Sequence, residues 1–159
     1  MAKKAPKWLN PREMKAWRAY IIASRRLLEA LDSDLVGFDL SMPDYEVLAQ
    51  LSDAPGRRMR MSELADLAMV SKSRLSHRMK VMEKAGWVKR ETCKEDKRGS
   101  WAVMTEKGWR AIVAAAPSHV DSVRERFVDQ LSPKEQESLA VIFGHLQSEL
   151  REQFKSEEA

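Results

Sequence analysis

The sequence predicts a mainly α (α+β) protein built around a winged helix-turn-helix. Two observations predict this fold class. Within residues 62–104, two short helical patterns joined by a tight turn precede two short strand patterns around a charged loop. On both sides of that stretch, apolar residues recur at helical spacing. Two short helices joined in this way are the signature of a helix-turn-helix, and a hairpin directly after the second helix is a wing.

The second helix of the motif is predicted from residue 71 to residue 86. Leu75, Met79 and Met82 recur at i, i+4 and i+7, which places them on one inward face. Ser71 is a favourable N-cap, and Gly86 stands where a left-handed residue commonly ends a helix. Both ends of this helix are therefore marked in the sequence.

Polar and basic residues occupy the remaining surface of this helix. A charged face alone is typical of any solvated surface helix, which is the first alternative reading. The preceding helix and the following hairpin favour a helix that reaches the base edges of duplex DNA. The candidate DNA-binding residues of the helix are Lys72, Ser73, Arg74, Ser76, His77, Arg78 and Lys80.

The elements around this helix follow from local signals. Ser62 is expected to cap the first helix of the motif. The wing strands are expected at Trp87 to Thr92 and Ser100 to Met104, because β-branched and aromatic residues are frequent there. Residues 57–61 are expected to add a short strand that pairs with the wing.

Several motifs together resemble the MarR (multiple antibiotic resistance regulator) family of transcriptional regulators. Ser62-Glu63-Leu64-Ala65 opens the first helix, and Val70-Ser71 followed by Ser76 matches the entry to the family's recognition helix. Glu83-Lys84-Ala85-Gly86-Trp87-Val88-Lys89-Arg90 is similar to the family's Leu-Glu-x-x-Gly-Leu-Val-x-Arg. Asp96-Lys97-Arg98-Gly99 and Met104-Thr105-Glu106-Lys107-Gly108 match the wing and the start of the next helix. The motifs cover residues 62–108.

The resemblance implies a homodimeric repressor that binds a palindromic operator in double-stranded DNA. In the wing, Arg98 resembles the family's minor-groove arginine and Asp96 the carboxylate that holds it, with Lys94 and Lys97 as further DNA-binding candidates. A small aromatic or amphipathic effector is implied between the dimerisation helices and the DNA-binding lobe. The candidate effector-pocket residues are Trp17, Tyr20, Tyr45 and Trp109, for which ordinary packing is the alternative.

Two residues depart from the family pattern. Met69 stands in the turn where the family often has glycine, and His77 stands on the recognition helix where arginine is common. The second change alters the DNA-reading surface, so base preference does not carry over from relatives. Cys93, beside Lys94, is either a redox-sensitive thiol or an ordinary cysteine at the end of a strand.

The rest of the chain is predicted to be helical. A first helix begins at Asn10-Pro11, and its apolar stripe faces the core, a partner helix or a ligand. A second helix begins at Met42-Pro43, within a stretch from Asp32 to Gly56 whose charged residues are all acidic and which is expected to be solvated. A helix from Thr105, with Trp109, Ile112, Val113 and Ala116 inward, should kink or break at Pro117. The last helix follows a capping box at Ser132-Pro133-Lys134-Glu135.

These elements give a single winged-helix regulator domain over residues 1–159. Its DNA-binding lobe is expected at 41–104, with the helix-turn-helix at 62–85 and the wing at 87–104. The helices at 10–36 and 105–154 resemble the family's dimerisation region. Their apolar stripes exceed what a motif of this size needs.

The composition argues against a disordered protein and against a membrane-spanning one. With 43% hydrophobic and 33% charged residues, the chain is expected to fold, and no apolar run approaches the ~20 residues that span a membrane. We therefore expect a cytoplasmic protein. Residues 57–101 hold 13 Lys and Arg against 6 Asp and Glu, a net charge of +7 in a chain of +4. Clustered cations of this kind are typical of a phosphate-binding surface.

No residues with metal-ligand spacing, no phosphate-binding glycine loop and no catalytic constellation occur in the sequence, so neither cofactor nor enzyme activity is expected. Two functions compete with the regulator. One is an architectural DNA-binding protein of low sequence specificity. The other is a protein-binding winged helix, which the cluster of basic residues disfavours.

Overall fold

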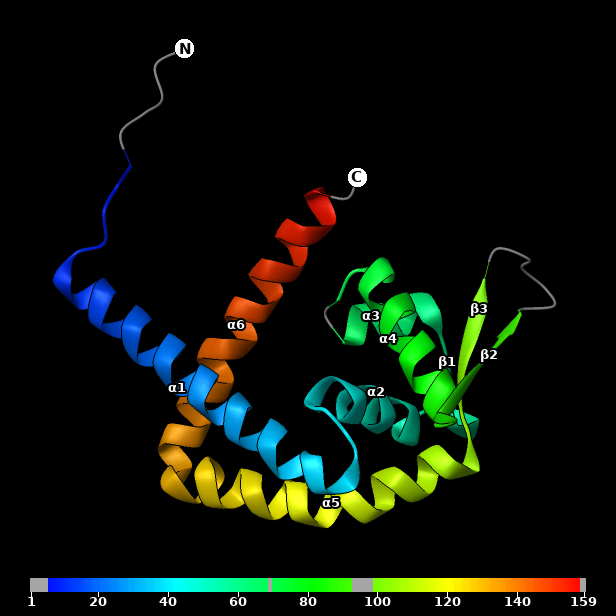
Figure 1. Ribbon diagram of the computed structural model, residues 1–159. Coiled ribbons are helices and arrows are strands. Elements are labelled where there is room, and N and C mark those ends of the chain that lie inside the picture. Colours follow the sequence, from blue (N-terminus) through cyan, green and yellow to red (C-terminus); the bar gives the residue numbers. More distant parts are fainter. Residues whose placement is uncertain (1–5, 69, 93–98, 158–159) are drawn as a thin grey trace. The chain divides into compact units, whose positions relative to one another are not determined.

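The computed structural model describes residues 6–68, 70–92 and 99–157 (Figure 1). The chain divides into two compact units, Met1–His119 and Val120–Ala159, with the boundary inside one helix. The elements run in the order α1 (Pro11–Leu35), the 3-10 turn Val36–Phe38, α2 (Met42–Asp53), the 3-10 turn Pro55–Arg57, β1 (Arg58–Arg60), α3 (Met61–Leu67), α4 (Lys72–Ala85), β2 (Val88–Thr92), β3 (Ser100–Met104), α5 (Glu106–Arg126), the 3-10 turn Val128–Gln130 and α6 (Pro133–Glu157).

The first two helices begin where the sequence predicts. Asn10 and Glu13 form a reciprocal capping box at the start of α1, with Pro11 as the first helical residue. Ser41 and Asp44 form another at the start of α2. Each box satisfies backbone N–H groups that the helix itself leaves without acceptors.

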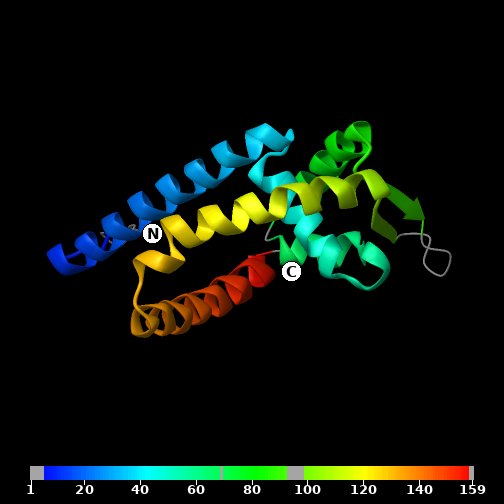
Figure 2. The same ribbon diagram turned by 90° about the horizontal axis from the view of Figure 1, so that it is seen from below.

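The three strands form one antiparallel sheet in the order β1-β3-β2. In the β2–β3 hairpin Val88 pairs with Met104, and in the β1–β3 pair Arg60 lies opposite Trp101. The wing hairpin and the extra strand from residues 57–61 are therefore confirmed. Figure 1 shows the hairpin directly after α4, and Figure 2 shows the sheet at the start of α5.

The core of the first unit lies where α2, α3, α4 and the inner face of the sheet meet. Two large side chains of α2, one of α3 and two of α4 have no exposed surface: Leu48, Leu51, Leu64, Met79 and Met82. Burying side chains of this size contributes roughly 1.5–3 kcal/mol each. This packing orients α4 within the unit.

Two helix boundaries differ from the prediction. The helix α3 begins at Met61, with Arg60 at the N-cap and no side-chain cap, so the prediction that Ser62 caps it is wrong. Met61 packs against the core and is already helical, which moves the start ahead of the serine. The turn residue Met69 lies outside the described residues.

The helix α5 runs through Pro117 without interruption, so a break at this residue is also wrong. Proline removes one hydrogen bond, to the carbonyl of Val113. Val113 is half exposed rather than inward as predicted, and water can replace the missing bond there. Ile112 is buried as predicted, and Ala115 is buried as well.

The second unit contains the end of α5 and the whole of α6. Ser132 and Glu135 form the predicted capping box: the Ser132 N–H donates to Glu135 Oε2 at 2.8 Å, and the Glu135 N–H donates to Ser132 Oγ. A stripe of large apolar side chains on α6 is 38–52% exposed, made of Ile142, Phe143, Leu146 and Leu150. In the part of the chain that the structure describes, no helix is both long and apolar enough to cross a bilayer.

At Gly108 two backbone segments approach each other closely. A Cβ atom at this position would lie 2.1 Å from the carbonyl oxygen of Trp87. The Trp87 carbonyl is held in place, because it accepts a hydrogen bond from the Thr105 N–H at 2.9 Å. Position 108 therefore requires a residue without a side chain.

We expect Gly108→Ala to lower the free energy of unfolding by about 1–3 kcal/mol or more, the cost of forcing atoms into a packed site. Gly144→Ala is the matched control, because nothing lies within 4 Å of a Cβ at that helical position. Alanine there should leave stability unchanged or raise it by up to ~1 kcal/mol. Urea unfolding of both variants measures the difference, and equal stabilities would contradict a steric limit at Gly108.

Candidate nucleic-acid interface

The helix α4 presents a defined face to solvent because both its ends and its inner side are fixed. At its start the Ser71 hydroxyl accepts a hydrogen bond from the Arg74 N–H at 3.3 Å. At its end Gly86 adopts a left-handed conformation with φ of 79°. Leu75, Met79 and Met82 are the buried residues of this helix, as predicted. The side opposite this stripe consequently faces solvent.

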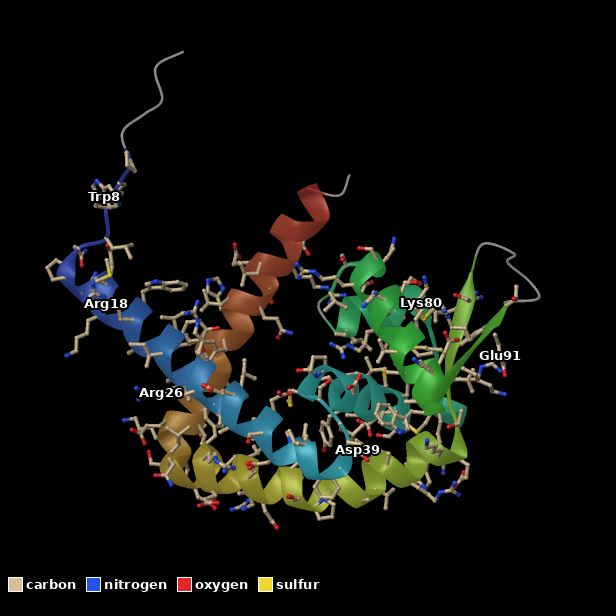
Figure 3. The ribbon with its side chains drawn as sticks, viewed as in Figure 1. Trp8, Arg18, Arg26, Asp39, Lys80 and Glu91 are labelled. Atoms are coloured by element: carbon tan, nitrogen blue, oxygen red, sulfur yellow. The ribbon has the colours of Figure 1, made fainter. Side chains whose placement is uncertain are left out.

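Most of the predicted DNA-binding residues of α4 are exposed on that side. Figure 3 shows Lys80 among the side chains of α4. Lys84 continues the exposed surface by one further turn. The exposed members of the predicted set are Lys72, Ser73, Arg74, His77 and Lys80.

Arg78 has a different environment from these residues. Its guanidinium donates to Asp44 Oδ1 at 3.3 Å and to the Ser41 hydroxyl at 3.4 Å, both at the start of α2. Asp44 is only 5% exposed, so the expectation that the acidic stretch is solvated is wrong at this residue. Removing one partner of such a pair leaves a buried charge without compensation. Arg78 thus ties α4 to α2.

Asp32 also departs from the expectation of a solvated acidic stretch. Its carboxylate accepts a hydrogen bond from the Met42 N–H at 2.6 Å. A carboxylate near the first turn of α2 is favourable because the N-terminal end of a helix carries partial positive charge. The last turn of α1 is therefore joined to the first turn of α2.

Ser76 belongs to a second set of contacts that fixes α4, on the side of the wing. Arg90 of β2 makes a bidentate contact with Glu83, from Nη2 to Oε2 at 2.6 Å and from Nε to Oε1 at 3.1 Å, and donates to the Ser76 hydroxyl at 3.4 Å. These hydrogen bonds hold the pKa of the Glu83 carboxyl below its usual range, and the positive charges of Arg90 and Lys80 lower it further. The contact joins α4 to the first strand of the wing.

The tip of the wing lies outside the described residues. The predicted residues Lys94, Asp96, Lys97 and Arg98 fall there, as does Cys93. The described strands bring Thr92 and Ser100 opposite each other at the base of the tip. The predicted roles of the tip residues stay predictions.

The four residues predicted for an effector pocket make three different contacts. Trp17 and Tyr20 lie on α1, about half exposed, with ring centroids 6.2 Å apart. Tyr45 is buried against the His119 ring at 4.1 Å, and Trp109 carries the Arg57 guanidinium at 3.8 Å. A cavity of about 470 Å³ in the described residues is lined by none of these four.

The fold and the exposed basic face of α4 define the class of protein: a winged helix-turn-helix protein with a free recognition helix. Comparison with known proteins narrows the class. Residues 38–99 match the family model described as MarR family. The transcriptional regulator HosA of Escherichia coli is 36% identical over 99 residues, which cover 62% of this chain and 71% of HosA.

Two solved structures are similar over almost the whole chain. AbsC, a MarR family transcriptional regulator from Streptomyces coelicolor, is 44% identical with a TM-score of 0.89, over 92% of this chain and 99% of AbsC. Sco3205, a MarR family transcriptional regulator from the same organism solved in complex with DNA, is 41% identical with a TM-score of 0.88, over 91% and 92%. The chain belongs to the MarR family of transcriptional regulators. Because this family consists of regulators, the prediction that the protein is not an enzyme is confirmed.

The Glu83–Arg90 contact predicts a pH-dependent contribution to stability. The folded-state pKa of Glu83 is lowered, so the contribution is fully present above the unfolded-state value, near 4.5, and is lost as pH falls through the lowered pKa. Glu83→Gln should therefore be less stable than wild type at pH 7, and the difference should vanish at acidic pH.

Urea unfolding at a series of pH values measures this difference. Glu63→Gln is the control, because Glu63 is exposed and has no ion-pair partner in the residues described. A gap between Glu83→Gln and wild type that stays constant from pH 7 to pH 3 would contradict the assignment.

Proposed function

We propose that the protein is a sequence-specific DNA-binding regulator that acts as a homodimer in the cytoplasm and represses transcription by occluding promoters. The observation that carries the proposal is that some polar side chains of α4 bind other parts of the fold, whereas others face solvent. Arg78 and Ser76 are engaged by other elements of the fold, whereas Ser73, His77 and Lys80 face solvent on a helix that is fixed on every other side. The structure of Sco3205 in complex with DNA supports the same role for a relative that is 41% identical.

In the proposed complex α4 enters the major groove of duplex DNA. Ser73 and His77 carry hydrogen-bonding groups that can meet base edges, while Lys72, Arg74 and Lys80 neutralise phosphates. Phosphate contacts set affinity and register, and base contacts set sequence preference. Because His77 replaces an arginine that is common in relatives, we expect a base preference of its own for this protein.

The wing tip completes the proposed interface. Arg98 is the candidate for insertion into the minor groove, where negative potential is concentrated, and Asp96 is the candidate for orienting it. Lys94 and Lys97 would add phosphate contacts on either side. The strands that carry the tip are joined to α4 by the contact between Arg90 and Glu83.

A homodimer is proposed because of the exposed apolar stripe on α6. Ile142, Leu146 and Leu150 are each about half exposed within a single chain. Water contact with such a stripe is unfavourable, and a second copy of the same helix would bury it. A two-fold dimer would present two copies of α4 to successive major grooves about 34 Å apart, which requires a palindromic operator.

An effector is proposed to control the dimer. A ligand relieves repression only if it binds the DNA-incompetent arrangement more tightly than the competent one. Trp17 and Tyr20 support the proposal, because they expose aromatic surface on α1, one of the proposed dimerisation helices. Tyr45 and Trp109 would contribute only if their contacts with His119 and Arg57 opened.

Selection of bound DNA from random duplexes tests the proposal. A regulator should enrich a palindrome with half-sites one helical turn apart. Broad recovery without a motif would instead identify an architectural DNA-binding protein. Recovery of no duplex at low salt would overturn DNA binding altogether.

We expect substitutions at His77 and Lys80 to act differently in the same selection. His77→Ala should relax the preference at one base pair per half-site, a loss of about 1–3 kcal/mol of discrimination. Lys80→Ala should weaken binding to all sequences alike and make the dependence of log K on log salt shallower by about 1 per protomer. An unchanged motif for His77→Ala would remove this residue from base reading.

We expect Leu146→Glu to convert the dimer to a monomer and to weaken operator binding by at least tenfold, because it places a charge in the apolar stripe of α6. Val141→Glu is the matched control, since Val141 is 74% exposed and lies on the opposite side of the same helix. Analytical ultracentrifugation and circular dichroism report the mass and the helix content. A Leu146→Glu protein that remains dimeric would contradict dimerisation through this stripe.

A further inference from the structure

The outer face of the three-stranded sheet is a second surface that carries cations. Side chains alternate between the two faces of a strand, and Met59, Ala102 and Met104 are buried on the inner face. The pairing of Arg58 with Val103 and of Arg60 with Trp101 places their side chains together on the other face. We call this surface the outer sheet face, formed by Arg58, Arg60, Lys89, Glu91, Trp101 and Val103.

Trp101 organises the arginines of this face. The Arg58 guanidinium carbon lies 4.3 Å from the centre of the Trp101 ring, and that of Arg60 lies 4.7 Å from it. A guanidinium stacked on an aromatic ring uses its flat face, so the N–H groups at its edge remain available to an acceptor. Holding the two side chains in place in advance lowers the entropy lost when a ligand binds.

Neither Arg58 nor Arg60 has a carboxylate within ion-pair distance among the residues described. Several other cations of the lobe form ion pairs with carboxylates of the same chain. Arg57 contacts Glu106 at 3.2 Å, and Lys89 contacts Glu91 at 2.8 Å. Further examples are the pairs Arg78–Asp44 and Arg90–Glu83. Two stacked arginines that form no ion pair among the described residues therefore remain on the outer sheet face.

The position of this face indicates which anion it meets. Arg60 is the N-cap residue of α3, the first helix of the helix-turn-helix, which in such motifs crosses the DNA backbone. Trp101 lies one residue after the start of β3, so it is close to the base of the wing tip. The two arginines are thus located between two parts of the lobe that are expected to contact DNA.

The nearby cavity disfavours a small anion as the partner. This cavity of about 470 Å³ is lined by Arg58 and Trp101 but also by Asp53 and Glu63. Two carboxylates would repel an anion that entered it. A ligand that stays outside the cavity and lies along the strand avoids this repulsion.

We propose that Arg58 and Arg60, held on Trp101, bind the sugar-phosphate backbone of duplex DNA beyond the base pairs that α4 reads. The inference rests on the proposed DNA-binding function and extends its footprint. Phosphate contacts of this kind carry no sequence information, so the outer sheet face adds affinity and salt dependence without changing the operator motif.

The test compares two duplexes: the selected palindrome alone, and the same palindrome extended by about ten base pairs on each side, one helical turn. The wild-type protein should bind the extended duplex more tightly. In Arg58→Ala/Arg60→Ala that gain should disappear. On the extended duplex the salt dependence of log K should become shallower by about 2 per protomer, following two lost phosphate contacts. Affinity for the short duplex should stay within twofold of wild type.

Two further variants keep the test decisive. Arg57→Ala removes the neighbouring arginine, whose guanidinium lies on Trp109 and beside Glu106, and should retain the gain. Arg58→Lys/Arg60→Lys keeps both charges and should retain most of the salt dependence even if the alanine variant folds poorly. A wild-type protein whose affinity does not grow with duplex length, or an alanine variant that keeps the full gain, overturns the inference.

Failure of the proposed function looks different: the wild-type protein would then bind neither duplex, or the preceding selection would give no palindrome. An acidic protein segment is the remaining occupant of this face. It would be indicated if the alanine variant behaved as wild type on both duplexes but lost binding to a poly-glutamate peptide. That result would also overturn the backbone contact.

Discussion

The end of α4 and the start of α5 share one set of hydrogen bonds, and the DNA-binding lobe depends on this junction. The last carbonyls of a helix have no partners within it. Here the Lys107 ammonium donates to the Ala85 carbonyl at 2.7 Å, and the Thr105 hydroxyl donates to the Gly86 carbonyl at 2.7 Å. The same hydroxyl accepts from the Gly108 N–H at 3.1 Å. One threonine thus ends the recognition helix and begins the helix that leaves the lobe.

This junction has a mechanical consequence for the regulator. The start of α5 is fixed to α4 through backbone groups, and α2 is fixed to α4 through Arg78 and the buried Asp44. Asp32 extends the connection to the last turn of α1. These contacts form a continuous connection from the end of α1 through α2 to the recognition helix. The buried carboxylate of Asp44 is the point where that connection is most costly to break.

Local signals explain which parts of the fold could be predicted from sequence. The stripe of Leu75, Met79 and Met82, the caps of α1 and α6, and the hairpin depend on residues a few positions apart, so their spacing determines them. The burial of Asp44 depends on Arg78, 34 residues away. No pattern in the acidic stretch distinguishes it from its solvated neighbours. The predicted helix break at Pro117 was wrong for a different reason. An exposed position in a long helix tolerates the loss of one hydrogen bond.

The sequence predicted which helix forms the candidate site, but not which residues of that helix remain exposed. Residue type identified the basic helix, but Ser76 and Arg78 have the same chemistry as residues that remain exposed, and only their partners on β2 and α2 separate them. Arg58 and Arg60, in contrast, were not predicted as site residues, although we propose that they bind DNA. Their strand was predicted, yet the stacking on Trp101 depends on the pairing of two strands some forty residues apart in the chain.

The net charge of the lobe therefore does not show which of its surfaces can attract DNA. Some of its cations are paired with carboxylates, whereas the two stacked arginines of the outer sheet face form no ion pair among the residues described. Residues 57–101 carry a net charge of +7, but part of that charge is balanced by carboxylates outside this stretch, Asp44 beside Arg78 and Glu106 beside Arg57. A cation that stabilises the fold has its charge neutralised nearby and attracts phosphate weakly, because its field is cancelled over distances beyond the pair. We propose that the remainder attracts DNA: the exposed cations of α4 and the arginines stacked on Trp101. The two groups lie on different elements, so a duplex that met both would be held along its length as well as in one groove.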